Sequence, residues 1–83
     1  MQFNASRTRY FLRKAAATYD VSSTWVRAGK LGVDIEKFER VSWPLVRGLT
    51  TIDGSALKKN IFAARKFGPL PQSQGRLYDI LTS

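Results

Sequence analysis

The sequence contains no cysteine and no histidine. Without cysteine the chain can form neither disulfide bonds nor thiolate metal sites. Without histidine it lacks the commonest general base of enzymes and the commonest protein ligand for metals. Acidic residues are also scarce, because six Asp and Glu stand against fourteen Lys and Arg. Since phosphate-binding loops and nucleophile motifs are missing as well, the sequence predicts a protein that is not an enzyme and uses no cofactor and no metal.

Long hydrophobic runs are absent too, and none approaches the ~20 apolar residues that a membrane-spanning helix requires. The opening stretch MQFNASRTRYFLRKAAATY has four basic residues and no acid, a composition similar to that of a mitochondrial presequence. We nevertheless expect this stretch to form a basic first helix of the domain. The expected location is the cytoplasm of a bacterial or phage-infected cell, with the matrix of an organelle as the alternative.

The excess of positive charge is the strongest signal in the composition. The 83 residues, expected to form one domain over 1–83, carry a formal net charge of +8, and 43% of them are hydrophobic. Small basic domains typically bind polyanions. We therefore expect a nucleic-acid-binding protein that favours DNA over RNA, a small regulator or architectural factor of the phage or plasmid type.

Two other functions remain open at this point. One is an RNA-contacting structural subunit of a large assembly, such as a ribosome or an organellar complex. The other is a small basic inhibitor that docks on an acidic protein surface. Self-association is a further partnership that the sequence leaves open.

Glycine, proline and capping residues divide the chain into short segments, which predicts a mainly α, compact bundle of four to five short helices. The predicted helices span, in order, residues 6–19, 22–29, 34–43, 44–49 and 55–67. Their expected N-caps are Ser6, Ser22 or Ser23, Asp34, and Asp53 or Ser55. Helical spacing of apolar residues predicts a buried core that contains Phe11, Leu12, Ile35, Phe38, Leu57 and Ile61.

The C-terminal segment GPLPQSQGRLYDILTS has two interpretations. Ser73 or Gln74 can open a final helical turn over residues 76–81. Alternatively, RLYDIL can be a short strand of a small C-terminal β-hairpin, which would form a wing beside the basic helix.

Residues 16–32, AATYDVSSTWVRAGKLG, have the order of features of a helix-turn-helix. Ala16 supplies a small residue for the helix crossing, Asp20 stands at the turn, and Val21 is the apolar residue after it. With the Val-Ser pair at 21–22 and RAGKL at 27–31, the stretch resembles the helix-turn-helix of small phage and plasmid excisionases and of MerR-like winged-helix regulators.

This resemblance implies that the second helix of the unit lies in the major groove of DNA. It implies base contacts from Ser23, Thr24 and Arg27 and a backbone contact from Lys30. The alternative is an ordinary helix, loop and helix, in which Trp25 packs inward and the two glycines at 29 and 32 shape a loop.

The stretch LKKNIFAARKF at 57–67 is the stronger candidate for contact with a polyanion. It predicts four cations on one side of a helix, with Phe62 projecting among them and away from the inner apolar stripe. Cations contact phosphates, and an exposed aromatic ring can stack on a base. The alternative is that Phe62 fills a groove between helices. Together with the first helix, the predicted nucleic-acid contacts outside 16–32 are Arg7, Arg9, Arg13, Lys14, Lys58, Lys59, Phe62, Arg65 and Lys66.

Overall fold

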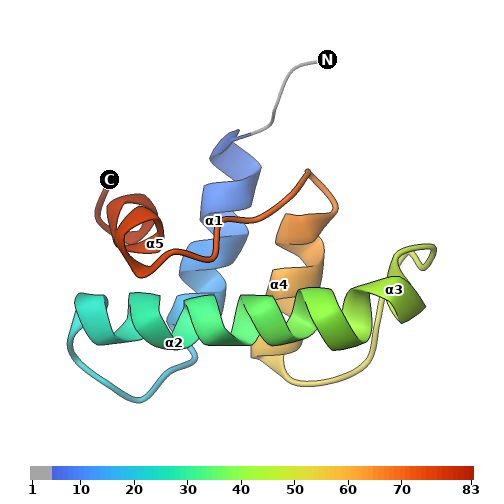
Figure 1. Ribbon diagram of the computed structural model, residues 1–83, viewed down its shortest axis with the longest axis horizontal. Coiled ribbons are helices and arrows are strands. Elements are labelled where there is room, and N and C mark those ends of the chain that lie inside the picture. The colour runs from blue at the N-terminus through green and yellow to red at the C-terminus, as the bar shows by residue number, and fades with distance from the viewer. Residues whose placement is uncertain (1–4) are drawn as a thin grey trace.

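The computed structural model describes residues 5–83, which fold into helices joined by loops (Figure 1). In chain order these are α1 (Ala5–Ala16), α2 (Thr24–Lys37), the π-helical turn η1 (Phe38–Ser42), α3 (Trp43–Val46), α4 (Ala56–Arg65) and α5 (Gln74–Thr82). Residues 5–83 contain no strand, so the predicted mainly α fold class is confirmed. The β-hairpin does not form, because α5 occupies the residues that it would need.

The helices pair in an interleaved order along the chain. α1 lies beside α4, and α2 packs against α5 (Figure 1). α2, η1 and α3 continue into one another as a single rod, and this rod crosses the α1–α4 pair. The core lies where these elements meet, and its fully buried large side chains are Leu12, Leu31, Ile35, Ile61 and Leu77.

Most of the predicted core is confirmed. Leu12, Ile35, Phe38 and Ile61 are buried, as the helical spacing of apolar residues predicts. Phe11 and Leu57 were expected in the core as well, but both are only partly buried and pack against its edge.

The second helix continues where the sequence predicts that it stops. Gly29 and Gly32 both lie inside α2, so the end at Gly29 and the new helix at Asp34 are wrong. Glycine lowers helix stability by ~1 kcal/mol relative to alanine but does not terminate a helix by itself. Here the missing side chain makes room for the segment before α5: a Cβ built on Gly32 would lie 2.5 Å from the carbonyl oxygen of Gln72.

Asp34 serves a different purpose from the predicted N-cap. It lies in the middle of α2, where its carboxylate accepts a hydrogen bond from the hydroxyl of Tyr19. This bond ties the connection after α1 to the side of α2. Burial of the ring, together with the bonded carboxylate, raises the pKa of Tyr19 above its ordinary value.

Pro44 produces a π-helical turn instead of the predicted helix end. Proline has no N–H and its ring clashes with the carbonyl four residues earlier, so an uninterrupted α-helix could not pass through Arg40 and Pro44. In η1 the amide of Trp43 bonds instead to the carbonyl of Phe38, five residues back. The rod therefore continues into α3, which has the proline in its first turn.

Serine caps define three of the helix starts, and each serine is one of the alternatives that the sequence left open. The hydroxyls of Ser23, Ser55 and Ser73 accept hydrogen bonds from backbone amides of α2, α4 and α5. Ser6 is not a cap, because α1 already begins at Ala5. After α4, Gly68 takes a φ of +135°, which favours glycine and turns the chain away from the helix.

Candidate nucleic-acid interface

A row of aromatic and cationic side chains runs along the seam between α1 and the end of α4. The guanidinium of Arg7 lies 5.9 Å from the ring centroid of Phe67, and the Phe67 ring stacks on Phe11 at 6.1 Å. Phe11 in turn meets Tyr10 edge-on at 5.2 Å, and the Lys14 ammonium lies 5.3 Å from the Tyr10 centroid. We call these five side chains the aromatic ladder.

An apolar cleft of about 440 Å³ opens beside this ladder and shares two of its rings. It is lined by loop residues before α4, by residues of α4 and the two positions after it, and by Phe11 in the middle of α1. The lining residues are Phe11, Thr50, Thr51, Ile52, Lys59, Phe62, Ala63, Lys66 and Phe67. We call this the phenylalanine cleft, since three of its apolar lining residues are phenylalanines and two of its other lining residues are lysines.

The lysines of this region carry charge that no carboxylate neutralises. Lys14, Lys59 and Lys66 form no ion pair with any residue between 5 and 83. The ammonium of Lys66 donates to the carbonyl oxygen of Arg47 at 3.1 Å and lies 5.0 Å from the centroid of Phe62. Aromatic faces and carbonyl dipoles stabilise an ammonium without cancelling its charge, so the cleft attracts anions.

The predicted exposure of Phe62 is wrong. The side chain is only 4% exposed and packs against Trp43, with ring centroids 6.2 Å apart. The rod formed by α2, η1 and α3 brings Trp43 against Phe62, which belongs to the buried core. The alternative interpretation, in which Phe62 fills a groove between helices, is the one that the structure has.

The four cations of α4 and its C-terminal end do not share one surface. Arg65 is ion-paired to Glu39 at 2.5 Å, and its guanidinium lies 4.4 Å from the Trp43 centroid. Lys58 lines a separate cleft of about 310 Å³ together with Lys37. Only Lys59 and Lys66 line the phenylalanine cleft.

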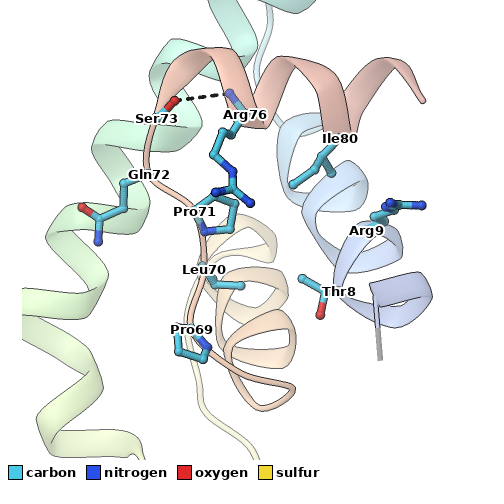
Figure 2. Close-up of a pocket in the computed structure, with 9 residues that line it drawn as sticks. All are labelled: Thr8, Arg9, Pro69, Leu70, Pro71, Gln72, Ser73, Arg76 and Ile80. Atoms are coloured by element: carbon cyan, nitrogen blue, oxygen red, sulfur yellow. Dashed lines mark hydrogen bonds between the residues drawn. The ribbon is translucent and has the colours of Figure 1, made fainter. Parts of the chain in front are cut away.

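The remaining predicted cations of α1 face other parts of the molecule. Arg13 donates to the backbone oxygens of Ile80 and Ser83, which fixes it to the end of α5. Arg9 lines a cleft of about 520 Å³ between α1 and the segment that leads into α5. Figure 2 shows Arg76 extending beside Pro71 on one side of that cleft, while Arg9 points away on the other side. The two arginines therefore do not converge on one point.

The residues of the helix-turn-helix expectation occupy different environments. Ser23 is engaged as the cap of α2, accepting from the amide of Val26, and Thr24 is half-buried. Arg27 is half-buried beside Arg13 and Leu81, and its Nε is buried with no hydrogen-bond partner among residues 5–83. Lys30 is exposed, as Ser23 is, but no hydrogen bond or ion pair with residues 5–83 engages the Lys30 side chain.

The sequence indicated the cations but not the cleft. The sequence predicted that Phe67 ends a helix, that Phe11 lies in the core, and that residues 50–52 only connect two helices. Their neighbours offered one signal, because Phe11 and Phe67 each lie close in sequence to basic residues. That signal is weak, since the cleft depends on how three separate segments meet.

Comparisons of the chain with protein-family models, with curated proteins and with solved structures give no match. Within residues 5–83, no helix is long and apolar enough to cross a membrane. The same part of the chain has no group of three or more acidic, histidine or cysteine side chains that could hold a metal ion. The fold and the site thus define a small, basic, mainly α-helical protein with an apolar cleft bordered by lysines.

Proposed function

We propose that the protein is a non-enzymatic nucleic-acid-binding protein, favouring DNA, that acts as a small regulator or architectural factor. The observation that carries this proposal is the joining of the phenylalanine cleft and the aromatic ladder into one region of α1 and α4. Lys14, Lys59 and Lys66 lie in this region without carboxylate partners among residues 5–83. Unpaired cations beside aromatic rings suit a ligand that has both phosphates and bases.

In this proposal α1 and α2 form a helix-turn-helix-like unit joined by residues 17–23. Lys30 is the backbone contact of that unit, because its side chain is exposed on α2. Arg27 supports the packing of α2 against α1 and α5 rather than reading bases, since its side chain is half-buried there. The α1–α4 region accordingly provides the larger share of the affinity.

The dependence of binding on salt tests the proposal. Each phosphate that the protein neutralises contributes ~0.9 to the slope of log affinity against log salt concentration on duplex DNA. The double variant Lys59→Ala/Lys66→Ala should therefore lower the slope by up to ~2. The measurement is fluorescence anisotropy of a labelled duplex over a salt series.

The matched control is Lys37→Ala/Lys58→Ala, which removes the same charge from the cleft between α2 and α4. This control should leave the slope nearly unchanged. Equal reductions in both double variants would contradict the assignment of the α1–α4 region as the interface. Absence of any salt-dependent affinity of the wild type for nucleic acid would contradict the proposed function itself.

A further inference from the structure

We infer that the phenylalanine cleft holds one unpaired nucleobase, so that the ligand is a single strand or a locally opened duplex. This inference rests on the proposed function and specifies the form of nucleic acid that the protein recognises. The sequence predicted that an exposed Phe62 stacks on a base. In this inference the base instead enters the cleft that Phe62 lines.

The shape and chemistry of the cleft suit a flat aromatic ligand. Its lining includes Phe11 and Phe67, whose rings stack on each other at an interplanar angle of 13°, so a base would lie against this pair of rings and not between them. Ile52 and Ala63 complete an apolar lining within a volume of about 440 Å³. A base inside a duplex has both faces covered by its neighbours, so only an unpaired base can place a face against these rings.

The polar groups of the cleft match the rest of a nucleotide. Thr50 and Thr51 bring hydroxyls that can donate to and accept from the edge of a base. Lys59 and Lys66 bring ammonium groups for the phosphates that flank it. Because every base has an aromatic face, this arrangement predicts binding that tolerates many sequences.

The charge of the cleft disfavours two other occupants, a second copy of the chain and a neutral apolar ligand. A second copy of the chain would bring a further net charge of +8 toward Lys59 and Lys66. A neutral apolar ligand would cover these two ammonium groups without providing an anion, which carries a desolvation cost. A base with its phosphates meets both requirements.

The experiment compares short oligo-dT with a duplex of equal phosphate number and with a strand of the same length made of abasic nucleotides. Fluorescence anisotropy at one salt concentration gives the three affinities. Oligo-dT should bind at least about tenfold more tightly than the abasic strand, as expected for the loss of one base stack. The duplex should resemble the abasic strand.

Two variants locate the effect in the cleft. Ala63→Trp should fill the cleft while leaving both lysines in place, and Phe67→Leu should keep apolar volume while removing the aromatic face. Each should reduce oligo-dT affinity by about tenfold and leave affinity for the abasic strand unchanged. Ala56→Trp, on the exposed first turn of α4, is the matched control and should bind oligo-dT as the wild type does. Circular dichroism confirms that each variant is folded.

The outcomes separate this inference from the proposed function. If oligo-dT and the abasic strand bind equally, or if both folded cleft variants retain full oligo-dT affinity, the cleft does not bind a base. The proposed nucleic-acid binding is then unaffected. If neither strand nor duplex binds in a salt-dependent way, the proposed function and the base seat both fail. If Ala56→Trp reduces oligo-dT affinity as strongly as Ala63→Trp does, the cleft is not the seat.

Discussion

At the scale of single residues, Gly32 determines how closely the chain before α5 can approach α2. A Cβ at this position would lie 2.5 Å from a backbone oxygen, that of Gln72, and backbone cannot move aside cheaply. Gly→Ala inside a helix ordinarily stabilises a protein by ~0.5–1 kcal/mol. For Gly32→Ala we expect the opposite sign, a loss of ~1–3 kcal/mol from overpacking, measured by urea unfolding.

Gly29→Ala provides the comparison for this prediction. A Cβ there would lie 2.7 Å from Nε2 of Gln74, the far end of a flexible side chain. That amide donates to the carbonyl oxygen of Trp25 at 2.9 Å on an exposed part of the surface. We therefore expect Gly29→Ala to change stability by less than Gly32→Ala does, and equal losses would show that close approach is not the cause.

Tyr19 makes stability depend on pH in the alkaline range. In the folded protein, burial and the hydrogen bond to Asp34 raise the pKa of the Tyr19 hydroxyl above its ordinary value of 10.0, so folding favours the neutral phenol. The stability that this group contributes is complete below about pH 10 and is lost as the pH rises toward the raised pKa. The phenolate absorbance of Tyr19 should therefore appear together with the loss of helical circular dichroism.

The variant Tyr19→Phe shows which part of the alkaline titration comes from Tyr19. This variant should lose one tyrosinate from the alkaline titration and should unfold with a weaker dependence on pH above about 10. Appearance of the Tyr19 phenolate while the helices remain intact would contradict the prediction.

At the scale of elements, local signals predicted where helices begin better than where they end. Ser23, Ser55 and Ser73 cap helices because a short side-chain oxygen satisfies a free backbone amide, and this depends on a few neighbouring residues. The continuation of α2 through Gly29 and Gly32 was not predictable in this way. The two glycines lie against Gln74 and Gln72, which are about forty residues further along the chain, so a local pattern could not show why glycine stands inside the helix.

The π-helical turn η1 sets the rotation of α3 about the axis of the rod. Its extra residue lets Trp43 contact Phe38 at 6.3 Å and Phe62 at 6.2 Å between centroids. Deletion of Arg40 removes the extra residue and places Trp43 four residues after Phe38, so Trp43 keeps its direction in an α-helical turn. The ring of Pro44 then meets the carbonyl of Glu39, which becomes the residue four positions earlier. We therefore expect the deletion to cost at least ~2 kcal/mol, as for a proline inside an α-helix, measured by urea unfolding.

Arg40→Ala is the control without a change in length. It removes only an exposed ion pair with Glu36, worth ~0.3–0.5 kcal/mol. If the deletion costs no more than this substitution, the clash of Pro44 with an α-helical turn is not the reason for the π-helical turn.

At the scale of the whole molecule, the sequence predicted the amount of positive charge but not its distribution. Helical spacing placed Lys58, Lys59, Arg65 and Lys66 on one side of a helix. In the folded protein these side chains lie in different places. Arg65 forms an ion pair with Glu39, and Lys58 lines the cleft between α2 and α4. Periodicity describes one helix in isolation, whereas the free surface of that helix depends on every element that packs against it.

The interleaved pairing, α1 with α4 and α2 with α5, has a consequence for the synthesis of the protein. When the first half of the chain has emerged from the ribosome, neither α1 nor α2 has its main partner, so the apolar faces of both remain open to water. The last contact to form involves α5, whose Leu77 is fully buried in the finished core. A nascent chain of this topology gains its stability only after α5 has emerged, and any fragment that lacks α5 is exposed to aggregation and proteolysis.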